Sequence, residues 1–303
     1  MRSLPEVIRR SGGVAATHEL LAFGVSSHAL TAAVRSGVLV RPRQGWYALP
    51  SAREDYIRAV RVGGRLASVS AAATYGLAVP QEFPLHVHVP HEASRLRTEG
   101  DRFVRLSDAV GETTIIHRGR VSPPTRATRL RVSLLDCLLQ VATTESEDDA
   151  VACIDSALRR GLLDDEGVEW LRQRLPERRQ RVIAMADGRS DSYPESICRC
   201  KLVRAGISTR PQVPVLAERW IDLLIGDRLA LEIDGAGKYT EDMTPAEVAR
   251  RVNADRQRDA FLEALGYHVI RISYFMVMFD WPATLSMIQA VMERGEHLSR
   301  VKR

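Results

Sequence analysis

The chain has 303 residues, a length typical of two domains or three small ones. Hydrophobic residues make up 45% of it and charged residues 27%, a balance that excludes wholesale disorder. No apolar run reaches the roughly 18 residues that a membrane span requires, and the first residues lack the apolar core of a secretory signal. We therefore expect a cytoplasmic protein that has no membrane partner.

Positive charge is concentrated at the start of the chain. The formal net charge is +5, and residues 1–61 hold an excess of arginines over acidic residues that equals this value. A basic module on an otherwise balanced chain favours a polyanionic partner, of which nucleic acid is the commonest. The alternative interpretation is a solvated basic face without a ligand.

Residues 1–50 predict a winged helix-turn-helix domain. Apolar spacing and glycine stops indicate three short helices, at 4–11, 18–24 and 28–37. The segment 38–49 alternates around a Pro-Arg-Gln-Gly turn, which is typical of a two-stranded hairpin. In such a domain the third helix enters the major groove of DNA, and the hairpin, called the wing, meets the phosphate backbone.

Six side chains of this domain are candidate DNA contacts. Four of them form the exposed stripe of the third helix: Ser27, His28, Thr31 and Arg35. Arg41 and Arg43 flank the wing turn, where phosphate contacts are expected. Trp46 and Tyr47 fit packing of the wing onto the helices better than stacking on bases.

The stretch SGGVAATHELLAFGVSSHALTAAVRSGVLVRPRQGWYAL, residues 11–49, resembles the N-terminal winged-helix domain of AbiEi-type antitoxins from type IV toxin–antitoxin systems. The resemblance implies a domain that binds DNA and can repress its own operon. It also implies a cognate toxin as a partner, although nothing in this stretch describes that toxin.

Residues 51–186 predict an α+β region without a catalytic constellation. A helical pattern at 65–80 precedes an alternating strand at 84–90, and the pattern is helical again from Leu130 onward. The region resembles the middle part of AbiEi-like proteins, which implies a role in spacing and packing. The polar segment 187–193 is expected to be a linker.

Residues 194–303 predict a separate domain in which helices flank a mixed sheet. Its elements are expected as a helix at 194–206, strands at 209–215, 220–226 and 229–235, a helix at 246–266, a strand at 267–273 and a helix at 282–295. This order of strands and helices is typical of an α/β domain.

Carboxylates interrupt two apolar strands of this domain. Glu232 and Asp234 share one face of LALEIDG because side chains alternate along a strand, and Asp222 interrupts WIDLLIG. A three-residue connection that pairs Ile225 with Leu229 places Asp222 opposite Glu232, whereas a two-residue turn would separate their faces. Carboxylates so placed repel one another and resist burial, so we expect a cation between them.

Converging carboxylates form an oxygen-rich site suited to Mg²⁺ or Mn²⁺. Glu195, on the preceding helix, would add a further ligand, and Lys238 would orient a water or stabilise charge on phosphate. Arg258 of the long helix suits either a functional role, in contact with the scissile phosphate or in support of the carboxylates, or an ion pair along its own helix. The alternative to the whole site is a set of surface carboxylates on an edge strand.

The C-terminal part resembles the very-short-patch-repair-type branch of the PD-(D/E)xK nuclease superfamily. The resemblance rests on Glu195, Asp222 in RWIDLLIG, Glu232 and Asp234 in LALEIDG, and the segment DRQRDAFLEALGYHVIRIS. It implies a restriction-endonuclease-like α/β domain in which Asp222 and Glu232 bind the metal and Glu195 completes its shell. Asp234 stands where the superfamily usually has lysine, and Lys238 would compensate for this departure.

Together these patterns predict an α/β multidomain protein that binds duplex DNA and hydrolyses its phosphodiester bonds with a metal ion, in defence or repair. The alternative is an antitoxin or transcriptional regulator whose C-terminal fold does not cleave. A metal-dependent nuclease that acts on RNA is a third interpretation.

Overall fold

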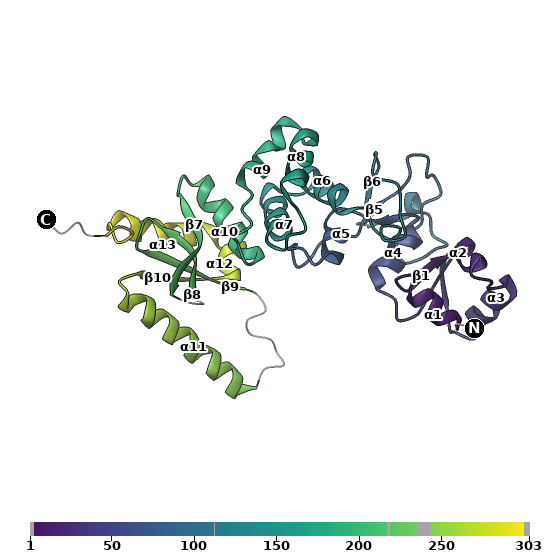
Figure 1. Ribbon diagram of the computed structural model, residues 1–303, viewed down its shortest axis with the longest axis horizontal. Coiled ribbons are helices and arrows are strands. Elements are labelled where there is room, and N and C mark those ends of the chain that lie inside the picture. The colour runs from purple at the N-terminus through teal and green to yellow at the C-terminus, as the bar shows by residue number, and fades with distance from the viewer. Residues whose placement is uncertain (1–2, 112, 217–218, 236–243, 300–303) are drawn as a thin grey trace. The chain divides into compact units, whose positions relative to one another are not determined.

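The computed structural model describes residues 3–111, 113–216, 219–235 and 244–299. Its internal contacts divide the chain into two compact units, Met1–Thr144 and Glu145–Arg303 (Figure 1). Within the described ranges, no helix combines the length and the apolar character that crossing a bilayer demands.

The first unit begins with three short helices and a three-stranded antiparallel sheet. These elements are α1 (Leu4–Arg9), β1 (Val14–Ala16), α2 (Thr17–Ala22), α3 (Ser27–Arg35), β2 (Val40–Arg43) and β3 (Trp46–Ala48). The strand order is β1-β3-β2, so the expected hairpin carries an additional strand, β1, on its far edge. Ile8, Leu20, Leu30 and Tyr47 are buried together and join the helices to the sheet. The element order is that of a winged helix.

The rest of the first unit is a small mixed sheet with helices around it. In chain order the elements are α4 (Glu54–Val62), β4 (Arg65–Leu66), α5 (Ser68–Thr74), β5 (His86–His88), the 3₁₀ turn η1 (Leu106–Asp108), β6 (Ile115–His117) and α6 (Leu134–Thr144). The expected helix at 65–80 is shorter, because Arg65 and Leu66 pair with β5. Gly64 allows this close approach, since a Cβ there would lie 2.1 Å from the carbonyl oxygen of His88.

The second unit starts with a helical layer. Its members are α7 (Glu147–Arg159), α8 (Asp165–Arg174), the 3₁₀ turn η2 (Glu177–Arg179) and α9 (Gln180–Met185). Pro176 separates α8 from η2, because a proline disfavours helical backbone in the residue before it, and Leu175 is extended.

The expected linker at 187–193 lies inside this second unit as a packed loop. The backbone N–H of Asp187 donates to Oδ1 of the buried Asp155 at 2.6 Å, and Ser190 is also buried. A buried carboxylate needs such donors, and the loop supplies one of them to Asp155.

A four-stranded mixed sheet with helices completes the second unit. Its elements are α10 (Tyr193–Arg204), β7 (Thr209–Leu216), β8 (Arg219–Ile225), β9 (Leu229–Asp234), α11 (Pro245–Ala264), β10 (His268–Ser273), α12 (Tyr274–Met278) and α13 (Trp281–Glu293). The strand order is β10-β9-β8-β7, with β10 parallel to β9 and the other pairs antiparallel. The expected elements are therefore present, and the short helix α12 is an addition.

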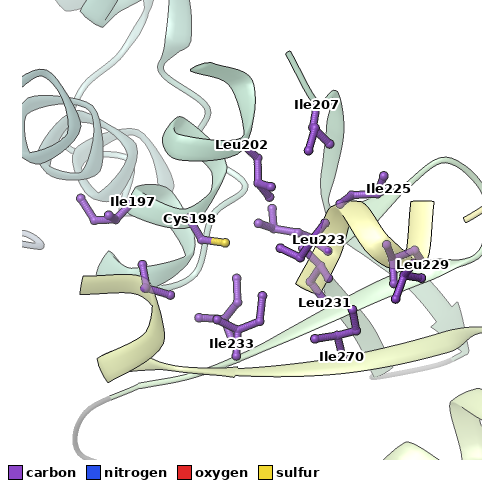
Figure 2. Close-up of a cluster of buried hydrophobic side chains, with 14 of the residues drawn as sticks. Ile197, Cys198, Leu202, Ile207, Leu223, Ile225, Leu229, Leu231, Ile233 and Ile270 are labelled. Carbon is purple, nitrogen blue, oxygen red and sulfur yellow. The ribbon is translucent and has the colours of Figure 1, made fainter. Parts of the chain in front are cut away.

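Both faces of this sheet are covered. Leu223 and Leu231 project from one face into the main core, where Ile197 and Cys198 of α10 meet them (Figure 2). On the other face, Leu224 and Ala230 pack with Leu262 of α11 in a smaller apolar cluster. Asp222, Glu232 and Asp234 of these strands belong to neither apolar cluster.

Candidate DNA-binding interface and carboxylate cluster

Helix α3 presents the stripe that the sequence predicts. Ser26 caps the helix, because its Oγ accepts a hydrogen bond from the backbone N–H of Ala29 at 3.1 Å. Leu30 is fully buried and anchors the opposite side of the helix. The four candidate contacts are all exposed: Ser27, His28, Thr31 and Arg35. The helix is therefore fixed to the core by one side and open to a ligand on the other.

Arg43 has a different position from the one expected of a phosphate contact. It is half-buried, and its Nη1 donates to the carbonyl oxygens of Arg61 and Val62 at 3.1 and 2.9 Å. Its Nη2 donates to the carbonyl oxygen of Arg95 at 2.6 Å. Burial, and then the charge of Arg97, lower the pKa of this guanidinium. Arg43 therefore fastens the wing to α4 and to the segment around Arg95, which sequence reasoning missed.

Arg41 keeps the exposed position that a phosphate contact needs. Its guanidinium lies 5.7 Å from the centre of the Tyr47 ring, and Tyr47 itself is buried. Trp46 packs against the apolar cluster of β1 and α4. Packing of both aromatic residues within the unit agrees with the prediction that they support the wing.

The strand register in the second unit is the one that a three-residue connection predicts. Ile225 pairs with Leu229, and the ladder continues to Leu223 opposite Leu231. One further step along this register places Asp222 opposite Glu232. Oδ2 of Asp222 also accepts a hydrogen bond from the backbone N–H of Ile233 at 2.7 Å, which ties the carboxylate directly to β9.

Gln212 of β7 connects Glu195 with Asp222. Its Nε2 donates to Oε2 of Glu195 at 2.9 Å and to Oδ1 of Asp222 at 3.4 Å. The backbone of Gln212 has a φ of +49°, in the left-handed region that a glutamine rarely adopts. Sequence reasoning missed this residue, although a lone amide between Pro211 and Pro214 is the signal that marks it.

Glu195 is held by its own helix start as well. The backbone N–H of Asp191 donates to Oε2 at 2.9 Å, and the hydroxyl of Ser192 donates to Oε1 at 2.7 Å. Ser192 also accepts from the backbone N–H of Glu195, so the two residues form the cap of α10. Glu195 as a whole is only 4% exposed.

Glu232 is paired with Arg258 from α11. Nε of Arg258 lies 2.7 Å from Oε2 of Glu232, and its Nη2 donates to the carbonyl oxygen of Trp220 at 2.5 Å. The second oxygen of Glu232, Oε1, is buried and has no hydrogen-bond partner among the described residues. Arg258 thus reaches from α11 to the sheet and pairs with one of the two carboxylate oxygens of the buried Glu232.

Glu195, Asp222 and Glu232 form the carboxylate cluster, and burial raises the pKa of all three. It raises the pKa of Glu195 and of Glu232 to about 7, and in both cases the charge of Asp222 adds to the effect. Burial also raises the pKa of Asp222, against which the N–H of Ile233 and the charge of Arg258 act. Two carboxyls that titrate near neutral pH beside a third attract either protons or a cation.

Asp234 belongs to a separate ion-pair group. Its Oδ1 lies 3.0 Å from Nη1 of Arg271, and Nε of Arg271 lies 2.9 Å from Oδ2 of Asp259 on α11. The structure thus gives the expected metal ligand Asp234 an arginine partner. Lys238, expected to assist catalysis, lies outside the described residues.

The donor chemistry of the cluster and its geometry lead to different conclusions about a metal ion. Carboxylate oxygens and the unpartnered Oε1 of Glu232 suit Mg²⁺ or Mn²⁺. Across the described parts of the chain, however, no three or more His, Cys, Asp or Glu side chains are grouped closely enough to hold an ion. Asp222 and Glu232 are therefore candidate ligands by chemistry, and the magnesium site stays a prediction.

Comparison with known families concerns the first unit. Residues 2–50 match the family model described as "Transcriptional regulator, AbiEi antitoxin". The match spans α1, α2, α3 and both strands of the wing. Comparison with curated proteins gives no match to the chain.

Proposed function

We propose that the chain is a DNA-binding transcriptional regulator of the AbiEi antitoxin type. One observation carries this proposal: a capped, core-anchored helix, α3, exposes Ser27, His28, Thr31 and Arg35 within the segment that matches the regulator family. The basic charge of the same segment supports a polyanionic ligand.

Each exposed side chain has a role in this proposal. Helix α3 enters the major groove, where Arg35 can donate two hydrogen bonds to guanine and His28 and Thr31 can contact base edges. Arg41 contacts a phosphate, which positions the helix without reading sequence. Arg43 has no phosphate contact in this proposal, because its guanidinium is hydrogen-bonded to carbonyl oxygens of α4 and attaches the wing to that helix.

Selection of bound duplexes from a random-sequence pool tests this function. The wild-type protein is expected to enrich a common sequence, and Arg35→Ala is expected to bind that sequence about tenfold or more weakly, the loss of one bidentate contact. Arg126→Ala is a matched control, because Arg126 is exposed outside the family match. Absence of any enriched sequence would contradict the regulator proposal.

The same proposal includes a protein partner. An antitoxin of this type acts together with a toxin, which we expect to be encoded beside it. Expression of the adjacent gene alone should arrest growth, and co-expression of this chain should restore it. Growth that is unaffected by the neighbouring gene would remove the antitoxin part and leave the regulator part.

A second candidate function is metal-dependent hydrolysis of DNA phosphodiester bonds by the second unit. The observation that favours it is the unpartnered Oε1 of the buried Glu232 beside the half-buried Asp222, two carboxylates on neighbouring strands. These two residues would hold the ion, and Gln212 would keep Glu195 beside them. A bound Mg²⁺ would supply a Lewis acid and an activated water.

Cleavage of supercoiled plasmid with Mg²⁺, Mn²⁺ or EDTA tests the second candidate. Nicking should require a metal and should disappear in Asp222→Ala and Glu232→Ala, but persist in Glu169→Ala, which removes an exposed acid of α8. The same assay with RNA tests the alternative substrate. A wild-type protein that binds duplex DNA and leaves both nucleic acids intact would exclude the nuclease and retain the regulator.

A further inference from the structure

An arginine-rich surface starts on the wing, and all but one of its arginines lie outside the segment that matches the regulator family. We define this arginine surface as Arg41, Arg95, Arg97, Arg102, Arg105 and Arg118. They line two surface hollows of about 790 and 490 Å³. Arg95 and Arg97 line both hollows, so the surface is continuous. Arg41 belongs to β2, and the surface therefore starts on the wing itself.

The charge of this surface is not neutralised from within. None of its six arginines forms an ion pair with a carboxylate in the described part of the chain. Arg102 donates to the carbonyl oxygen of Arg41 at 2.6 Å, and Arg118 donates to the carbonyl oxygens of Pro90, His91 and Ala93. Carbonyl oxygens orient a guanidinium but leave its positive charge in place.

The acidic residues between positions 95 and 108 line a different hollow from the arginines. Glu99, Asp101 and Asp108 line a separate hollow together. Glu99 also pairs with Arg58, which belongs to α4 and lines neither of the arginine hollows. The arginines and the acidic residues between positions 95 and 108 thus line different hollows, although the sequence mixes them.

The backbone holds the like charges close together. Arg97 and Arg105 form an isolated antiparallel bridge, and Thr98 closes the turn by exchanging hydrogen bonds with Asp101. Neighbouring arginines repel one another, which makes this surface less stable in the absence of a ligand. A polyanion that contacts several of them at once removes the repulsion. Phosphates spaced along a nucleic acid backbone match a continuous row of guanidinium groups.

We infer that the arginine surface binds the phosphate backbone of duplex DNA beside the sequence read by α3. The inference rests on the proposed function, because it places the same DNA molecule on both α3 and the arginine surface. Arg41 joins the two contacts, since it flanks the wing turn and lines the second hollow. The arginines of this surface beyond the wing then extend the DNA contact and add affinity without adding sequence specificity.

Salt-dependent binding of a duplex tests this inference. The probe is a mixed-sequence duplex of about 40 base pairs, and fluorescence anisotropy gives Kd between about 50 and 200 mM salt. The variant removes three charges, with Arg95→Ala, Arg97→Ala and Arg105→Ala together. The control removes the same charge from exposed positions that line neither hollow: Arg126→Ala, Arg160→Ala and Arg178→Ala.

The triple variant should bind at least about tenfold more weakly at about 0.1 M salt, and its slope of log K against log salt should fall by about 2.7, or about 0.9 for each phosphate contact. The control variant should keep the wild-type slope. Arg105→Ala alone should lower the slope by about 0.9, which keeps the test valid if the triple variant folds poorly.

Equal slopes for the triple variant and the control would overturn the inference and leave the regulator proposal intact, as long as the wild-type protein binds the duplex. A wild-type protein that binds no duplex at any salt concentration would overturn both. The single variant Arg35→Ala separates the two contacts further. It should weaken binding to the selected sequence by a larger factor than binding to the mixed-sequence duplex.

Discussion

Glu195 of α10 and Asp222 of β8 accept hydrogen bonds from the same amide, Nε2 of Gln212, at 2.9 and 3.4 Å. The shared donor lies between the buried carboxylate of Glu195 and the half-buried carboxylate of Asp222, which would otherwise repel each other. Gln212 makes these contacts from a left-handed backbone, with a φ of +49°. Such a conformation costs about 1 to 3 kcal/mol and persists where the surroundings require it. The carboxylate cluster is therefore assembled at the expense of backbone strain.

Two substitutions of Gln212 distinguish the contribution of its side-chain amide to stability from the cost of its strained backbone. Gln212→Ala removes the shared donor and keeps the strained φ, so we expect it to lower the free energy of unfolding by about 1 to 3 kcal/mol. Gln212→Gly removes the same amide but adopts a positive φ freely, and its loss should be smaller by about 1 kcal/mol. Urea unfolding measures both. Equal losses in the two variants would show that the backbone there is not strained.

Neutralisation of Glu232 should stabilise the protein in the absence of metal. Burial raises the pKa of this carboxyl to about 7, so above pH 7 its deprotonated form makes the folded state less stable. In EDTA at pH 8, Glu232→Gln should raise the free energy of unfolding by about 1 to 3 kcal/mol. At pH 5 the difference should shrink, because the folded protein then holds this carboxyl protonated.

Metal addition is the second half of that experiment. If Asp222 and Glu232 bind Mg²⁺, a saturating concentration should raise the melting temperature of the wild-type protein and leave that of Glu232→Gln unchanged. Glu169→Gln controls for general effects of removing an acid. A wild-type melting temperature that does not respond to Mg²⁺ or Mn²⁺ would contradict the metal site.

His88 should make the first unit sensitive to acid. It is buried, and burial, followed by the charge of Arg65, lowers its pKa. A histidine with a lowered pKa stays neutral when folded and gains a proton on unfolding, so stability is lost as the pH falls below about 6.5. His88→Gln should show a smaller loss between pH 7 and 5, measured by thermal unfolding. His91→Gln, at an exposed position, should behave like the wild type.

Arg41 and Arg43 should respond differently to the same substitution. Arg43→Ala removes hydrogen bonds to three carbonyl oxygens, and we expect it to lower the free energy of unfolding by about 2 kcal/mol. Arg41→Ala should leave stability within about 0.5 kcal/mol and weaken duplex binding. Circular dichroism melting and anisotropy together distinguish the two roles. Comparable loss of stability in both variants would contradict the assignment.

Local pattern predicts the elements of the second unit well. The sequence predicts the two apolar strands interrupted by Asp222 and Glu232 and leaves two registers open, of which the structure has the one that pairs Ile225 with Leu229. Helix α10 follows from its proline near the start and its glycine after the end. These features depend on residues that are close in sequence, so sequence reasoning reaches them.

Contacts between distant segments are what sequence reasoning could not reach. The role of Arg43 depends on carbonyl oxygens that lie 18 to 52 residues away along the chain. The shared donor Gln212 depends on a left-handed backbone that its residue type disfavours. The ion pair of Asp234 with Arg271 arises because β10 lies parallel to β9, and this pair gives an expected metal ligand a different partner.

Protection of DNA from nuclease digestion tests the central claim most directly. The probe is the stretch of DNA that precedes the protein's own reading frame, incubated with the wild-type protein and with a variant that carries His28→Ala and Arg35→Ala. Both positions are exposed on α3, so the variant should keep the wild-type circular dichroism spectrum. The regulator proposal predicts a protected segment with the wild-type protein and none with the variant. Equal protection by both proteins, or protection by neither, would contradict it.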